Sequence, residues 1–194
     1  TISSLLRLQG RRLPPGESRH ALEESERRVR SIALVHEILS RDTHDDVDFN
    51  DILPSLIRMA EDLGHDDRPL KVHCSGEAGR LQAAVATPLA VVITELLQNA
   101  AEHAFGDEPA GGRELVVRLY FERHGDRLHV VVRDNGVGLP PGFSVEATTS
   151  LGLSIVRGLI ASQMGGTIAM RSDGGTVVEL DIPVDVEVAD LESL

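Results

Sequence analysis

The chain has 194 residues, of which 41% are hydrophobic and 26% are charged, so it can bury a sizeable core. Its net charge of −12 argues against direct contact with nucleic acid or an anionic membrane, because both call for a basic face. The single cysteine, Cys74, excludes a disulfide framework and fits a reducing cytoplasm. The sequence contains neither a run of about 20 apolar residues, which a membrane span needs, nor a P-loop.

Residues 1–45 are predicted to form a helical hairpin. Residues 1–9 repeat apolar side chains at helical spacing, Pro-Pro-Gly at 14–16 marks a turn, and a second helix is expected over about 19–40. The seam of that second helix has the spacing of a heptad repeat and consists of Leu22, Ser25, Val29, Ile32, His36 and Leu39. Because one hairpin cannot cover both of its apolar seams, we predict a homodimer in which two hairpins form a four-helix bundle.

Residues 46–194 are predicted to form a second domain that combines strands and helices. Helices are expected over about 50–63 (capped by Asn50), 88–104 and 152–164. Strands are expected near 70–74, 81–83, 114–122, 127–133, 167–171 and 177–182. Because the strands occur in hairpins and do not alternate strictly with helices, the fold class is predicted to be α+β, with a largely antiparallel sheet covered by helices.

The predicted helix over 88–104 has a polar face without lysine or arginine. This face consists of Thr94, Glu95, Gln98, Asn99, Glu102 and His103. Glu95, Asn99 and His103 follow one another at intervals of four residues, so they lie one above another. Such a face is often only the solvated side of an amphipathic helix. A carboxylate beside an amide oxygen also suits Mg²⁺, which takes one or two protein oxygens and completes its shell with water and phosphate.

Three further segments combine glycines with polar residues. Asp134-Asn135-Gly136-Val137-Gly138 ends a predicted strand, and its aspartate can accept a hydrogen bond from an exocyclic amino group such as that of adenine. Residues 148–154 lead into a helix whose first N–H groups favour phosphate. Gly174-Gly175-Thr176 opens a strand. Taken singly, these segments could also be a tight turn, an ordinary capped helix start and a hairpin turn.

In their order and spacing, these segments resemble the GHKL family of ATPases, the Bergerat-fold group that includes gyrase, Hsp90, MutL and sensor histidine kinases. Residues 95–100 resemble the N box, residues 134–138 the G1 box, residues 150–156 the G2 box, and Gly175-Thr176 the last glycine–threonine element. Residues 1–45 resemble the helical hairpin of a histidine-kinase subclass related to the HWE kinases.

The resemblance implies a role for each matching residue. Asn99 would ligate a Mg²⁺ that bridges the ATP phosphates, and Asp134 would contact the adenine amino group with support from Thr176. Gly136 and Gly138 would shape the adenine wall, and the backbone of Ser150, Leu151 and Gly152 would meet phosphate. Residues 139–150 would be the ATP lid. Glu95 would act as general base or would organise water and Mg²⁺.

The sequence departs from the family pattern at the phosphate end. Glu102 stands where many histidine kinases have a basic residue, and residues 139–150 contain no lysine or arginine. The phosphate charge is therefore expected to be met by Mg²⁺, by backbone N–H groups and by His103 or Arg157. It follows that nucleotide binding should depend strongly on Mg²⁺.

The resemblance also places the phosphoacceptor histidine about two helical turns before Thr1. We therefore expect this chain to be a fragment that binds ATP but does not phosphorylate itself, with His36 packed in the bundle and His20 out of line with the motif. The expected function is that of the catalytic and dimerisation part of a cytoplasmic two-component sensor histidine kinase. Its partner would be a response regulator receiver domain, which in some relatives carries an RNA-binding antiterminator output. Alternatives are an anti-sigma-factor serine kinase of the same superfamily and a non-catalytic nucleotide-sensing dimerisation module.

Overall fold

The computed structural model describes residues 46–62, 69–104, 114–148 and 150–184, together with residues 8, 9, 16, 19, 22, 29 and 33. The chain divides into two compact units, Thr1–Thr43 and His44–Leu194. The hairpin and dimer seam predicted for residues 1–45 lie outside the described residues, apart from those isolated positions, and remain predictions.

The described part of the second unit contains a five-stranded sheet, a two-stranded sheet and a set of helices. The helices are α3 (Phe49–Glu61), α4 (Ala83–His103) and α5 (Leu151–Gly158), which continues into the π-helical turn η1 (Leu159–Gln163). The strands are β1 (Asp46–Asp48), β2 (Leu70–Gly76), β3 (Arg80–Gln82), β4 (Leu115–His124), β5 (Arg127–Asp134), β6 (Thr167–Ser172) and β7 (Thr176–Pro183). The large sheet has the order β2-β4-β5-β7-β6, and only its β2–β4 pairing is parallel. The predicted α+β class with a largely antiparallel sheet is confirmed.

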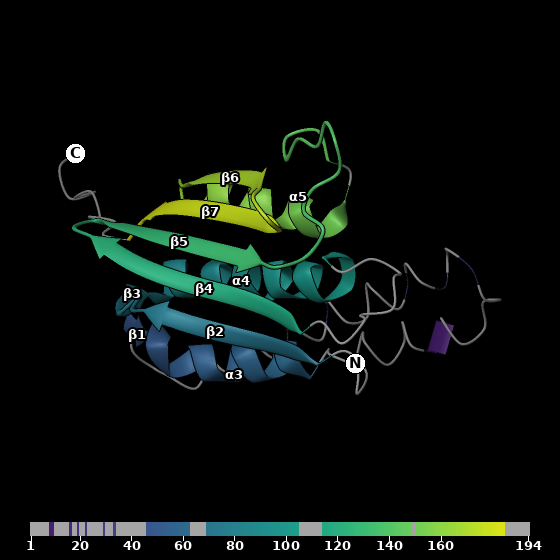
Figure 1. Ribbon diagram of the computed structural model, residues 1–194. Helices are drawn as coiled ribbons and strands as arrows, with labels where there is room; N and C mark the ends of the chain where they lie inside the picture. Colours follow the sequence, from purple (N-terminus) through teal and green to yellow (C-terminus); the bar gives the residue numbers. More distant parts are fainter. Residues whose placement is uncertain are drawn as a thin grey trace. The chain divides into compact units, whose positions relative to one another are not determined.

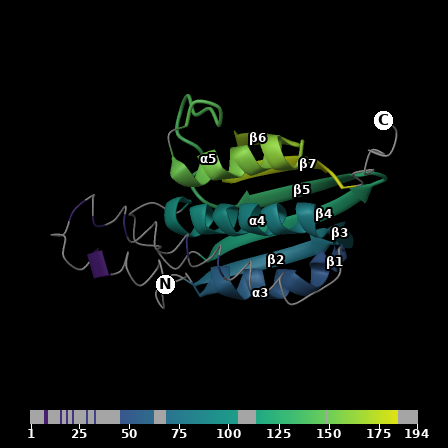
Figure 2. The same cartoon turned by 180° about the vertical axis from the view of Figure 1, so that it is seen from behind.

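The described helices of this unit lie on one face of the large sheet, and none of them covers the other face, which is termed the open face. Figure 1 shows the open face, and Figure 2, seen from behind, shows α3, α4 and α5 across the covered face. Alternate residues of the strands point into the core between sheet and helices, as in Leu128, Val130 and Val132 of β5. Helix α4 is long and apolar enough to cross a membrane by length and composition, but 78% of that stretch is buried, as befits a core helix.

Two local predictions were wrong. The cap of α3 is Asp48, whose Oδ1 accepts the N–H of Asn50 at 3.0 Å, and the Asn50 side chain instead accepts the N–H of Ala78. Helix α4 begins at Ala83 and not at Pro88, because the alanine-rich stretch before the proline is itself helical. The helix predicted over about 152–164 is confirmed to within one residue at each end, and its last part is a π-helical turn that ends at Gln163.

Candidate functional site

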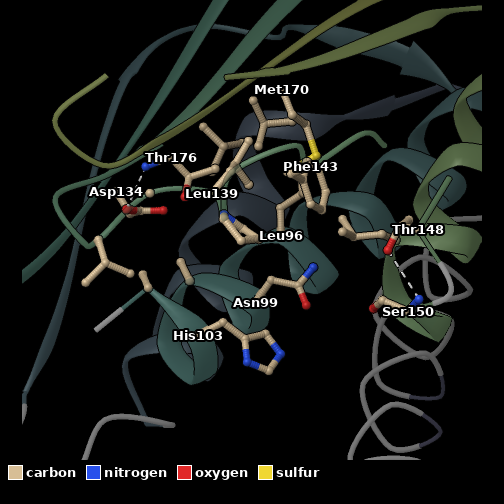
Figure 3. A pocket seen from close by; sticks show the side chains of 18 of the residues that line it. Leu96, Asn99, His103, Asp134, Leu139, Phe143, Thr148, Ser150, Met170 and Thr176 are labelled. Atoms are coloured by element: carbon tan, nitrogen blue, oxygen red, sulfur yellow. Dashed lines mark hydrogen bonds between the residues drawn. The ribbon is translucent and has the colours of Figure 1, made fainter. Parts of the chain in front are cut away.

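A cavity of about 560 Å³ lies between the end of α4, the ends of the central strands and the segment 139–150. Its lining combines a few polar side chains with many apolar ones. The polar lining residues are Asn99, His103, Asp134, Thr148, Ser150 and Thr176. Figure 3 shows Asp134 and Thr176 at one end, Thr148 and Ser150 at the other, and Asn99 and His103 between them. The Asp134 carboxylate and the side chains of Thr148 and Ser150 therefore lie on opposite sides of the cavity.

Asp134 is held in a single orientation at the end of β5. Its side chain is only 7% exposed, and its Oδ1 accepts the N–H of Gly136 at 2.8 Å and that of Thr176 at 2.9 Å. Among the described residues no other group donates to this carboxylate, so Oδ2 keeps its full capacity to accept a hydrogen bond. An acceptor fixed in this way at a cavity wall can select a ligand that presents an amino group.

The residues after Asp134 tie the end of β5 to its neighbours. Asn135 bonds to the edge of β4, since its Oδ1 accepts the N–H of Val116 and its Nδ2 donates to the carbonyl of Glu114. Gly136 lies against the end of α4, where an added Cβ would come within 1.9 Å of the Ala104 carbonyl oxygen. Gly136 is therefore required for the approach of the strand end to the helix, and it does not itself line the cavity.

A second close approach brings the β6–β7 turn to Asp134. An added Cβ at Gly175 would lie 2.1 Å from the backbone oxygen of Asp134, and Gly175 has a φ of +141°. Gly138 lines the cavity with a φ of +79°. Glycine at these positions lets the turn and the lid pass close to the strand end. The contact of Thr176 with Asp134 is made by its backbone N–H.

The polar face predicted for α4 is divided between the core and the cavity. Thr94, Glu95 and Gln98 are buried, so the helix has no simple solvated side at these positions. Asn99 and His103 line the cavity, whereas Glu95, at 1% exposure, does not. The buried Nδ2 of Asn99 has no hydrogen-bond partner among the described residues. This free donor suits an acceptor such as a phosphate oxygen. The amide oxygen of the same side chain is a ligand of the kind that Mg²⁺ accepts, so the chemistry of Asn99 is compatible with Mg²⁺.

The lid, residues 139–150, is attached to the domain at both of its ends. At its start the N–H of Leu139 donates to the Ser172 hydroxyl at 2.8 Å. Near its other end Arg157 donates to the carbonyl of Val145 at 3.2 Å and to that of Glu146. Arg157 does not line the cavity, so the expectation that it meets phosphate is replaced by a role in holding the lid. The Ser144 hydroxyl donates to the Glu146 carboxylate, which lowers the pKa of that exposed group.

The start of α5 lies next to the lid. Ser150 lines the cavity, Gly152 is buried and Leu151 is exposed. The Ser150 side chain makes no capping hydrogen bond, so it leaves the first N–H groups of the helix available to another acceptor.

The apolar lining of the cavity consists of Leu96, Ala100, Ala104, Val132, Val137, Leu139, Pro140, Pro141, Phe143, Leu153, Met170 and Val178. Those between positions 139 and 143 were predicted from the sequence to lie in the lid, but the others were not assigned to the lining. The signal for some of them was present, because Val132 and Val178 are inward positions of strands that end at the site. The alternation of apolar and polar residues along a strand predicts only that these side chains are buried. It does not predict whether they lie in the core or line a cavity.

Comparison with known proteins identifies the architecture. Residues 84–186 match the family model described as "Histidine kinase-, DNA gyrase B-, and HSP90-like ATPase". The chain belongs to this family. Residues 1–63 match a second model, described as "Histidine kinase". The kinase branch of the family, expected from the HWE-like resemblance, is therefore confirmed.

Curated relatives are sensor histidine kinases. The chain is 45% identical over 186 residues to "Sensor histidine kinase PdtaS" of Mycobacterium tuberculosis and 43% identical to its namesake in Mycolicibacterium smegmatis. These matches cover 95% of this chain and 36% of the M. tuberculosis protein, so the chain spans about a third of the length of these relatives. The chain thus carries the catalytic, ATPase-type domain of a sensor histidine kinase.

Solved structures show the same fold. The blue-light activated histidine kinase EL346 of Erythrobacter litoralis matches with a TM-score of 0.68 and 24% identity, over 85% of this chain and 54% of that one. The catalytic domain of histidine kinase ThkA matches with a TM-score of 0.53 and 22% identity, over 72% of this chain and 94% of that one.

Proposed function

We propose that the cavity binds Mg²⁺-ATP with adenine against Asp134 and the phosphates toward the start of α5. The observation that carries this proposal is the state of Asp134, whose Oδ1 is fixed by two backbone N–H groups while Oδ2 remains an acceptor. The adenine amino group supplies the matching donor. The apolar walls, which include Leu96, Val132 and Met170, would cover the flat faces of the base.

The phosphate end is proposed to rely on neutral and backbone groups. Asn99 would hold Mg²⁺, and His103 and the first N–H groups of α5 would face the phosphates. When bound, Mg²⁺ would neutralise part of the phosphate charge and orient the transferred group. Gly138 would shape the base wall directly, and Gly136 would act by seating the strand end on α4. For Glu95 we propose a role in the organisation of water near Asn99, one helical turn away.

The reaction proposed for the full-length protein is transfer of the γ-phosphoryl group to a histidine nitrogen and then to an aspartate of a response regulator. A neutral imidazole nitrogen is already a nucleophile, so the domain's contribution is to position ATP, neutralise charge and exclude water under the lid. The amino-terminal match to a histidine kinase model favours this reaction over serine phosphorylation. We also propose that residues 1–45 dimerise the protein, that residues 46–194 form its catalytic domain, and that both act in the cytoplasm.

Labelling with γ-labelled ATP tests this proposal. The full-length protein should acquire phosphate that is lost in acid and kept in base, whereas the 194-residue chain alone should bind ATP and stay unlabelled. Acid-stable label would support a serine kinase instead, and nucleotide binding without label in the full-length protein would support a nucleotide-sensing module. Acid-labile label on His36 or His20 of the chain alone would refute the expectation that it does not phosphorylate itself.

A further inference from the structure

The turn that carries Thr176 to Asp134 is also held from the open face of the sheet. Arg133 and Asp134 are consecutive in β5, so their side chains leave opposite faces of the sheet. On the covered side, Asp134 accepts the N–H of Thr176. On the open side, the Arg133 guanidinium donates to the Asp173 carbonyl at 2.6 Å and to its carboxylate at 3.2 Å. Arg133 and Asp134 of β5 thus form hydrogen bonds to the β6–β7 turn and its following residue from opposite faces of the sheet.

This turn contains one backbone hydrogen bond of its own, from the Asp173 N–H to the Gly175 carbonyl at 2.9 Å. It consists of Asp173, Gly174 and Gly175, and both glycines have positive φ angles, +60° and +141°. Glycine allows a turn many alternative conformations, so contacts outside the turn can add to this internal hydrogen bond in selecting the conformation that is seen. The selection has to be accurate, because the Gly175 backbone lies against the backbone of Asp134.

The Asp173 carboxylate is the centre of a small ionic network. Its Oδ2 also accepts from Arg171 at 3.2 Å, and Arg171 donates in turn to Glu179 at 3.1 Å. Arg133 and Arg171 both pair in register with Val177, so the two guanidinium groups approach the turn from the strands on either side of β7. Connected charges of this kind hold a geometry better than an isolated surface pair.

We propose that Arg133, acting through Asp173, is a positioning residue for base recognition: it holds the β6–β7 turn so that Thr176 orients Asp134 toward adenine. Arg133 does not line the cavity and would not touch the nucleotide. This inference rests on the proposed function of the cavity.

The chain contains a matched control for this pair. Arg127, at the start of β5, pairs with Asp181, near the end of β7, and the Arg127 Nε and Asp181 Oδ1 atoms are 2.5 Å apart. The side chains of that pair are 44% and 46% exposed, against 41% and 53% for Arg133 and Asp173. Both are arginine–aspartate pairs of similar exposure. They differ in the place of the aspartate, because Asp173 lies in the turn next to the cavity and Asp181 does not.

Titration calorimetry of the chain with Mg²⁺-ADP and with Mg²⁺-IDP, in which a carbonyl replaces the amino group of the base, tests the proposal. Arg133→Ala should weaken ADP binding by about three- to tenfold and reduce the preference for ADP over IDP, while Arg127→Ala leaves both unchanged. Arg133→Lys should recover part of the preference, because it restores the charge opposite Asp173. Asp173→Asn should cause less loss when added to Arg133→Ala than when made alone, because both changes remove the ionic contact of Arg133 with Asp173, and only the weakening of the Arg171 contact is then new.

Two outcomes would overturn the proposal. One is equal behaviour of Arg133→Ala and Arg127→Ala. The other is a loss of affinity in Arg133→Ala that leaves the ADP-to-IDP preference intact, since that would indicate a merely structural effect. Failure of the proposed function looks different, because the unaltered chain would then not bind ADP or would not prefer it to IDP.

Discussion

The two ends of the cavity are built in different ways. At the Asp134 end, strand β5, the β6–β7 turn and the end of α4 meet with hydrogen bonds and close backbone approaches that leave no space for a Cβ at Gly136 or Gly175. At the lid end, a loop without basic side chains is attached through Leu139 at its start and through Arg157 near its end. If the cavity binds Mg²⁺-ATP as proposed, the site for the base would be formed in the folded domain before the ligand binds, whereas the site for the phosphates would be completed only by the ligand and the cation.

The largest expected effect is on stability and concerns the Asp134 end of the cavity. Gly136→Ala should lower the free energy of unfolding by about 3 kcal/mol or more, because the new methyl group would overlap the Ala104 carbonyl. Gly158→Ala is the matched control: nothing lies within 4 Å of a Cβ there, and at this exposed position of α5 alanine should add about 0.5–1 kcal/mol to the free energy of unfolding. Urea unfolding of both variants measures the difference. Equal stability of the two variants would contradict the close contact at Gly136.

The next effect concerns the cation at the phosphate end. Removal of Mg²⁺ with EDTA should weaken ADP binding by about tenfold or more, because no lysine or arginine is among the residues that line the cavity in the described part of the chain. In Asn99→Ala, binding should be weak with and without Mg²⁺, since the proposed protein ligand is gone. Calorimetry in the two buffers measures this. Equal affinity of the unaltered chain in both would contradict a cation-dependent phosphate end.

The smallest effect concerns the attachment of the lid. Arg157→Ala should weaken ATP binding by about threefold and should speed hydrogen exchange in residues 139–148, because two lid carbonyls lose a charged donor. Arg58→Ala is a suitable control, since that exposed side chain donates to Ser55, far along the chain from the lid. Unchanged lid exchange in Arg157→Ala would show that the lid is held in another way.

Much of this fold could be predicted from the sequence because its strands alternate cleanly and its turns carry Gly-Asp and Gly-Gly signals. The segments holding Asn99 and Asp134 could be singled out, and the structure places both residues on one cavity. What could not be predicted depends on tertiary distance. Gly136 looked like a ligand-facing glycine, and its contact with Ala104 joins two segments far apart in the sequence. Arg157 looked like a free cation, and only the folded lid supplies the carbonyls that it binds.

The central claim is that the carboxylate of Asp134 accepts a hydrogen bond from the adenine amino group. Asp134→Asn tests this claim most directly. The asparagine can still accept the N–H groups of Gly136 and Thr176 through its oxygen, so the fold should be kept. Its amide NH₂ would then face the amino group of the base, donor against donor. Calorimetry with Mg²⁺-ADP should show one site in the unaltered chain and at least about a tenfold loss of affinity in the variant. Equal affinity of both proteins for ADP, with melting temperatures unchanged, would contradict the account.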